Sequence, residues 1–187
     1  MRLREITKMH RANDGNRSLI ESAMMPELAA ALRDWAQANT KSVLIGGLGL
    51  SYHVRPRMTQ DLDFLFEQES DLPEQIPGFK RTRPHAFQHN ETHVEVEAVT
   101  PELINVPRAI VQHVMRTAIE SNGIRVASAA GLVALKLFRL SMQDKADIIA
   151  LIKSGRMADL DQFPLPPDKV VAFQELAAAA QSDPHPA

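Results

Sequence analysis

Residues 43–66 read VLIGGLGLSYHVRPRMTQDLDFLF, a pattern that predicts two strands joined by a tight turn and a short helix. The apolar run before the two glycines predicts a buried strand, which the glycines end because they let the backbone turn sharply and approach a ligand closely. A helix over about residues 48–54 would follow, with N–H groups at its start that can bind a phosphate. Residues 61–66 predict a second strand, in which Asp61 and Asp63 share a face because alternate side chains project together. Two such carboxylates can bind a hard cation.

This ordered set of residues resembles the nucleotidyltransferase superfamily. Its members carry a Gly-Gly or Gly-Ser turn followed, roughly a dozen residues later, by an Asp-x-Asp strand. Because a lone Gly-Gly or Asp-x-Asp occurs in ordinary turns and strands, the ordered combination is what favours the family. The resemblance covers about residues 43–152 and is greatest to the AbiEii/AbiGii-type bacterial toxins and related bacterial families. The matching positions are Gly46, Gly47, His53, Arg57, Thr59, Asp61 and Asp63.

The resemblance implies an enzyme that transfers a nucleotide from a nucleoside triphosphate to an RNA or protein acceptor. In this chemistry a pair of divalent ions, Mg²⁺ or Mn²⁺, neutralises the charge that builds on the phosphate oxygens. Asp61 and Asp63 would bind the metal, and the family supplies a third acid from a neighbouring strand. Glu97, which lies between two apolar residues, best matches that third position, and Glu95 is the alternative. Both glutamates could instead form the solvated face of an amphipathic strand.

The residues expected to contact the nucleotide are Gly46, Gly47, Arg57, Thr59 and Lys136. Arg57 and Thr59 precede the acidic strand, where they could orient phosphates or support the aspartates. Lys136 lies among apolar residues of a predicted helix, where an ammonium needs an anionic partner. The helical sequence around Lys136 resembles the C-terminal motif of the family, so we expect this residue to contact the triphosphate. Lys136 could instead extend to solvent or pair with Asp144 or Asp147.

The rest of the chain predicts further helices and strands around this unit. A helix over residues 26–39 would bury the apolar face formed by Leu28, Ala31, Leu32 and Trp35. One hairpin would have its arms at residues 79–88 and 92–99, with the acidic side chains of the second arm opposite its valines. Further helices are expected at about residues 107–121, 128–142, 144–155 and 168–180, and a short strand at 124–127. Ser128 would cap the second of these helices.

These elements predict an α/β fold with a small mixed β-sheet of the nucleotidyltransferase type, flanking helices and a helical C-terminal portion. Residues 1–127 would form the catalytic core, and residues 128–187 would close the nucleotide cleft. A chain of 187 residues is long enough to bury a hydrophobic core of this kind.

Composition and charge set further limits. The 21 Lys and Arg residues against 23 Asp and Glu residues give a net charge of −2, which provides no overall field that attracts nucleic acid. A local basic patch could contact a polyanion or could simply be a solvated hairpin; it comprises Lys80, Arg81, Arg83 and His85. The absence of cysteine excludes disulfides and thiolate metal sites and fits a reducing cytoplasm. Because no signal peptide or membrane span is apparent, we expect a soluble cytoplasmic protein that does not bind membranes.

The function implied by the resemblance is that of the toxin of a bacterial toxin–antitoxin pair, with a cognate antitoxin as a partner. One alternative is a minimal antitoxin-type nucleotidyltransferase that modifies a partner protein. A second alternative is a degenerate fold that binds nucleotide or a partner without catalysis, because Glu95 and Glu97 stand where aspartate is commoner. His53 is expected to be a packed or hydrogen-bonded support, and Ser51 lacks the sequence context of a hydrolase nucleophile.

Overall fold

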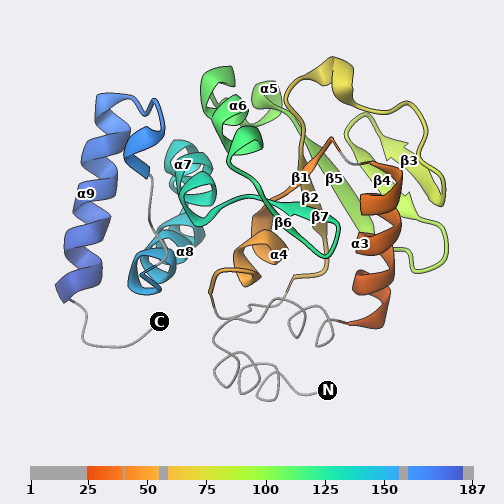
Figure 1. Ribbon diagram of the computed structural model, residues 1–187, viewed down its shortest axis with the longest axis horizontal. Coiled ribbons are helices and arrows are strands. Elements are labelled where there is room, and N and C mark those ends of the chain that lie inside the picture. Colours follow the sequence, from red (N-terminus) through yellow and green to blue (C-terminus); the bar gives the residue numbers. More distant parts are fainter. Residues whose placement is uncertain (1–24, 40, 55–58, 156–159, 183–187) are drawn as a thin grey trace.

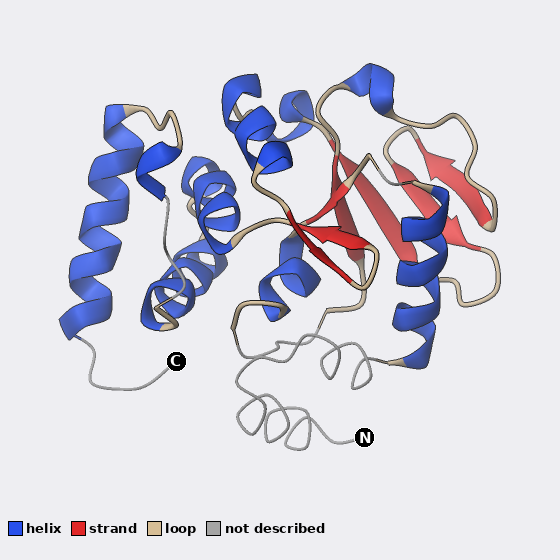
Figure 2. Ribbon diagram, in the orientation of Figure 1, coloured by secondary structure: helices blue, strands red, loops and turns tan. Residues whose placement is uncertain are grey.

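The computed structural model describes residues 25–39, 41–54, 59–155 and 160–182. These residues form a seven-stranded mixed sheet with helices on both sides of it and further helices toward the C-terminus (Figures 1 and 2). The strands are β1 (Val43–Leu44), β2 (Leu62–Leu65), β3 (Phe79–Arg83), β4 (Ala86–His89), β5 (Glu95–Val99), β6 (Ile119–Ser121) and β7 (Ile124–Val126). The helices are α3 (Pro26–Ala38), α4 (Gly46–Ser51), α5 (Pro101–Ile104), α6 (Arg108–Arg116), α7 (Ala129–Arg139), α8 (Met142–Lys153) and α9 (Pro167–Ser182). The α/β class with a mixed sheet and a helical C-terminal part is therefore confirmed.

The strand order is β3-β4-β5-β2-β1-β7-β6, so β2 lies at the centre of the sheet. β2 pairs with β1 in the antiparallel direction and with β5 in the parallel direction, and β1 also pairs in parallel with β7. A parallel pair needs a crossover connection, which between β2 and β5 is supplied by the 3₁₀ turn η1 (Glu69–Asp71) and the strands β3 and β4.

The two faces of the sheet bury separate hydrophobic clusters. Leu44, Phe64 and Ala98 belong to the cluster under α3, whereas Val43 and Leu65 belong to the cluster under α6 and α7. Neighbouring residues divide in this way because side chains alternate across a strand. Helices α7, α8 and α9 lie together on one side of the sheet in Figure 1. Across the described ranges, no helix combines the length and the apolar character needed to cross a bilayer.

Several of the predicted elements are confirmed. Helix α3 buries all four residues expected on its inward face, Leu28, Ala31, Leu32 and Trp35. Strand β7 occupies the expected short segment, and the side chain of Ser128 caps α7 by accepting a hydrogen bond from the backbone N–H of Gly131.

The predicted single hairpin over residues 79–88 and 92–99 is wrong. The chain turns at Pro84 and His85 and forms three strands, β3, β4 and β5, with a second turn between His89 and the start of β5. Proline cannot donate a hydrogen bond to a strand ladder, so a long arm through residue 84 is interrupted there.

The predicted helix over residues 107–121 is also too long. It ends at Arg116, and residues 119–121 instead form β6, which pairs with β7 across a turn at Asn122 and Gly123. Both turn residues have positive φ, of 51° and 76°. Asn-Gly is typical of a two-residue hairpin, so the dipeptide marks a strand turn rather than a helix end.

Two helix starts also differ from the prediction. Helix α4 begins at Gly46 rather than near residue 48 and ends at Ser51 rather than residue 54. Helix α8 begins at Met142, before the expected Asp144, because Ser141 and Asp144 form a reciprocal capping box.

Candidate functional site

A pocket of about 650 Å³ opens on the α7 face of the sheet, between β2, β5, α4, α5 and α7. Its polar lining consists of Gly46, Gly47, Asp63, Glu97, Lys136, Arg139 and Asp144. Its apolar lining consists of Ile45, Val99, Leu103, Ile104, Leu132, Leu135 and Phe138. The volume lies in the range usual for small-molecule sites, and the charged residues come both from the sheet and from α7 and α8.

Asp63 and Glu97 stand side by side in the sheet. The parallel register of β2 and β5 makes these two residues direct partners. Adjacent strands are about 4.8 Å apart, so the two carboxylates start from neighbouring points on one face. Asp63 is half-buried and Glu97 is exposed, and both line the pocket.

Gly46 lies against the carboxylate of Asp63. The φ angle of Gly46 is +61°, and a Cβ atom built on this residue would overlap the Asp63 side chain. The backbone N–H of Ile45 donates a hydrogen bond of 2.9 Å to the carbonyl of Asp63, which holds the turn against the strand. Position 46 therefore needs glycine for two reasons, its left-handed backbone and the close approach of an acid.

Asp61 and Glu95 do not line this pocket. The strand begins at Leu62, so Asp61 lies in the bend before it, where the alternation that would align it with Asp63 does not apply. Its side chain is exposed and its carbonyl accepts a hydrogen bond from Thr59. Glu95 forms an ion pair with Arg83 of β3. Of the two candidate glutamates, Glu97 is the one at the pocket.

The expected set of three acids is therefore not assembled. Among the residues that the structure describes, no group of three or more His, Asp or Glu side chains could hold a metal ion together. Asp63 and Glu97 remain as an adjacent pair. Thr59 does not line the pocket, and Arg57 lies outside the described residues.

Lys136 lines the pocket, but its ammonium is paired within the protein. Its Nζ atom donates hydrogen bonds to Asp147 Oδ2 at 2.7 Å and to Asp144 Oδ1 at 3.2 Å. All three side chains are buried. The structure thus contains the ion pairs that the sequence left open as the alternative to a triphosphate contact.

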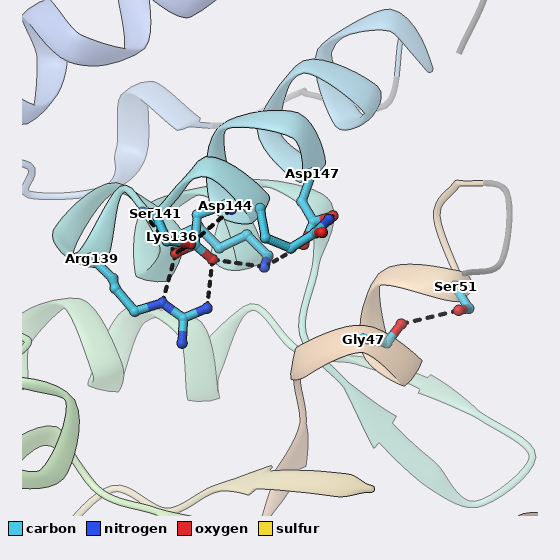
Figure 3. A network of polar contacts seen from close by, with 8 residues as sticks. Gly47, Ser51, Lys136, Arg139, Ser141, Asp144 and Asp147 are labelled. Atoms are coloured by element: carbon cyan, nitrogen blue, oxygen red, sulfur yellow. Dashed lines mark hydrogen bonds and ion pairs between the residues drawn. The ribbon is translucent and has the colours of Figure 1, made fainter. Parts of the chain in front are cut away.

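Arg139 belongs to the same network (Figure 3) and also lines the pocket. Its Nε and Nη2 atoms donate to the two oxygens of Asp144, at 2.6 Å and 2.9 Å. Burial tends to raise the pKa of Asp144, but the hydrogen bonds from Arg139, Ser141 and Lys136 outweigh it and hold the pKa well below its ordinary value. The same pairing with Asp144 raises the pKa of Arg139, which also feels the negative charge of Asp63.

Sequence reasoning missed the position of Arg139 in the pocket. The available signal was the spacing of Lys136 and Arg139, three residues apart, which places them on the same side of a helix. The carboxylates that pair with Lys136 and Arg139 lie on the next helix. The geometry of the turn between the two helices cannot be predicted from helix periodicity.

The polar residues near the end of α4 have structural roles. His53 is buried, and its Nε2 atom lies 2.7 Å from the carbonyl oxygen of Ala127, as expected of a supporting residue. The hydroxyl of Ser51 donates to the carbonyl of Gly47 within α4 (Figure 3).

The basic patch consists of three exposed residues of β3, Lys80, Arg81 and Arg83, and the half-buried turn residue His85. Arg81 donates to the carbonyl of Pro84, Arg83 pairs with Glu95, and His85 pairs with Glu69. These contacts are those of a solvated hairpin and lie apart from the pocket lining.

No protein-family model matches the sequence, and no curated protein matches it significantly. The fold and the pocket define an α/β protein with an adjacent pair of carboxylates beside a glycine turn. The resemblance to nucleotidyltransferases rests on the sequence motifs alone.

Proposed function

We propose that the protein is a metal-dependent nucleotidyltransferase that moves a nucleotide from a nucleoside triphosphate to an RNA or protein acceptor. The observation that carries this proposal is the direct pairing of Asp63 with Glu97 in parallel strands. A glycine turn lies against Asp63, and the pocket above the pair has the volume of a small-molecule site.

The residues at the pocket suit a divalent cation such as Mg²⁺ or Mn²⁺. Magnesium prefers oxygen ligands and keeps several waters, so two carboxylates and the phosphates of a substrate suffice to bind it. Asp63 and Glu97 are the residues that would hold the ion. When bound, it would neutralise charge that develops on the phosphate oxygens. Asp61, which lies outside the pocket, is assigned no ligand role.

The apolar part of the pocket suits the rest of the nucleotide. Leu103 and Ile104 of α5 face the pocket together with Leu135 and Phe138 of α7. Flat apolar surfaces bind a base by contact and exclude water from the neighbouring polar groups. In the biological setting that the motifs resemble, the protein would act as a bacterial toxin controlled by a cognate antitoxin.

A second candidate function is nucleotide binding without transfer. It is favoured by the position of Asp61, which leaves only Asp63 and Glu97 of the three acids expected to bind metal at the pocket. The two functions differ in one product, because only transfer releases pyrophosphate.

The test is incorporation of label from each α-labelled nucleoside triphosphate into total bacterial RNA or protein in the presence of Mg²⁺. Glu97→Gln and Glu95→Gln form a matched pair, since both remove a carboxylate from β5 but only Glu97 lines the pocket. We expect transfer to fall at least about a hundred-fold in Glu97→Gln, the scale for loss of a group that stabilises transition-state charge, and to persist in Glu95→Gln. Nucleotide binding with no incorporation and no pyrophosphate in the parent protein would support the second candidate instead.

A further inference from the structure

Arg139 presents its charge to the pocket, whereas Lys136 does not. The Arg139 side chain is 73% exposed, compared with 9% for Lys136. Both lie on α7 and both line the pocket. Access to an incoming anion therefore differs sharply between these two cations.

The guanidinium of Arg139 is held by one edge only. Nε and Nη2 bond to Asp144, and within the described part of the chain Nη1 makes no hydrogen bond. A guanidinium has more N–H groups than a carboxylate can accept, so it can bind a phosphate while it stays paired. Figure 3 shows the Asp144 carboxylate between the side chains of Arg139 and Lys136. Asp144 therefore holds the guanidinium of Arg139 on the side of the carboxylate opposite to Lys136.

Lys136 has no comparable freedom. Its ammonium is engaged by Asp144 and Asp147, and both carboxylates are themselves buried. An anion that drew Lys136 away would leave buried charges without their partner, which is costly.

From these contacts we propose that Arg139 is the phosphate-contacting cation of the pocket and that Asp144 is its positioning residue. This inference rests on the proposed function, because it takes the pocket to bind a nucleoside triphosphate. It reassigns the triphosphate contact that the sequence suggested for Lys136.

The charges of the pocket make this contact depend on a divalent cation. The lining carries three carboxylates, Asp63, Glu97 and Asp144, against two cations, Lys136 and Arg139. A triphosphate alone would meet a net negative surface, and Arg139 would remain attracted by Asp63. With a divalent ion at the carboxylate pair, the same surface becomes positive and Arg139 can turn to the phosphates.

The first experiment measures binding of ATP by calorimetry, with Mg²⁺ and with EDTA. The variants are Arg139→Gln, Arg139→Lys and, as a matched control, Arg83→Gln. Arg83 is also exposed, at 68%, and also pairs with a carboxylate, but it lies outside the pocket lining. We expect Arg139→Gln to weaken binding about ten- to a hundred-fold, the scale of a charged hydrogen bond. Arg139→Lys should restore part of this loss, and Arg83→Gln should bind as the parent does.

The second experiment uses the unchanged protein, so it does not depend on a variant that folds. Phenylglyoxal modifies accessible arginines, and mass spectrometry of peptides reports the extent at each site. We expect Mg²⁺ and ATP together to protect Arg139 at least about threefold while Arg83 reacts as before, since its exposure is nearly equal. ATP with EDTA should protect neither residue.

The outcomes separate this inference from the proposed function. If the parent binds ATP with Mg²⁺ but Arg139→Gln binds equally well, or if Arg139 is not protected, the assignment of Arg139 is overturned and the proposed function stands. If the parent binds no nucleoside triphosphate with Mg²⁺, both are overturned.

Discussion

The two faces of the sheet differ in the side chains that the same strands present on them. On the α3 face, Trp35 stacks on Phe64 at 5.2 Å and meets Phe79 and Phe87 edge-on, which closes the face with aromatic rings. On the α7 face, the preceding residue of β2 is Asp63, which borders the pocket. Burial of rings stabilises a fold, whereas clustered charges under partial burial cost free energy. The comparison indicates that the α3 face is closed by aromatic packing, whereas the α7 face combines a hydrophobic cluster with a pocket that carries charged side chains.

The sharpest test of this comparison is Asp63→Asn, which keeps the shape of the side chain and removes its charge. We expect nucleotide transfer to fall by at least about a hundred-fold, while thermal stability holds or rises because a charge near other acids is lost. Activity and melting temperature are measured on the same preparation. Equal transfer by variant and parent would make the α7 face a merely solvated surface.

On the α3 face, the corresponding test is Trp35→Ala, which should affect stability rather than ligand binding. Trp35 is fully buried, and its indole N–H donates to Ser42 at 3.2 Å. Truncation should lower the free energy of unfolding by about 3–5 kcal/mol, measured by urea denaturation. ATP affinity of the folded fraction should be unchanged. A loss of affinity as large as that of Asp63→Asn would contradict the division between the two faces.

Lys136→Met tests the buried ion pairs behind the pocket. The change leaves Asp144 and Asp147 buried without their shared cation, so we expect about 3 kcal/mol less stability. Lys145→Met is the control, because Lys145 is an exposed lysine of α8. In the double variant Lys136→Met, Asp147→Asn, part of the lost stability should return. A stable single variant with weakened ATP affinity would restore Lys136 as the phosphate contact.

The smallest expected effect concerns His113 in α6, which packs against Phe163. Its Nε2 atom is buried and finds no hydrogen-bond partner among the residues that the structure describes. Burial, with a smaller contribution from Arg116, lowers the pKa of His113 from its ordinary 6.5. The unfolded chain therefore takes up a proton before the folded protein does. Stability from this residue is complete above pH 6.5 and is lost as the pH falls through the lowered pKa.

The corresponding measurement is the melting temperature at pH 7.5 and at pH 5.5. The difference between the melting temperatures at these two pH values should be smaller in His113→Leu than in the parent, because leucine does not take up a proton. Arg116→Gln removes only the smaller cause and should reduce the difference in part. An unchanged difference in His113→Leu would assign the acid sensitivity to other groups.

Strand periodicity predicts the faces of these strands but leaves their register open. It places Glu95 and Glu97 on one side of β5, yet it cannot say which of them meets Asp63, because strand pairing is set by contacts far apart in the chain. The face on which Asp61 lies depends on where the strand begins. Side chains alternate between the two faces only within a strand. Strand β2 begins at Leu62, where its pairing with β5 starts.

Local signals predicted helices better than they predicted the partners of charged groups. The apolar face of α3 and the cap of α7 follow from nearest neighbours in the sequence. Lys136 meets carboxylates eight and eleven residues away because the chain reverses direction between α7 and α8. The residue at that reversal, Leu140, has a φ of 49°, which leucine rarely adopts and which its residue type does not suggest.

Through the Asp144 carboxylate, the start of α8 is coupled to the position of Arg139. The same oxygen that accepts from Arg139 Nε also accepts from the backbone N–H and the hydroxyl of Ser141. Any shift of the guanidinium toward a ligand changes how strongly this oxygen holds the first turn of the helix. Hydrogen exchange at the amides of residues 141 and 144 would then respond to occupancy of the pocket, although Ser141 does not line it, and would permit label-free screening of ligands on the native chain.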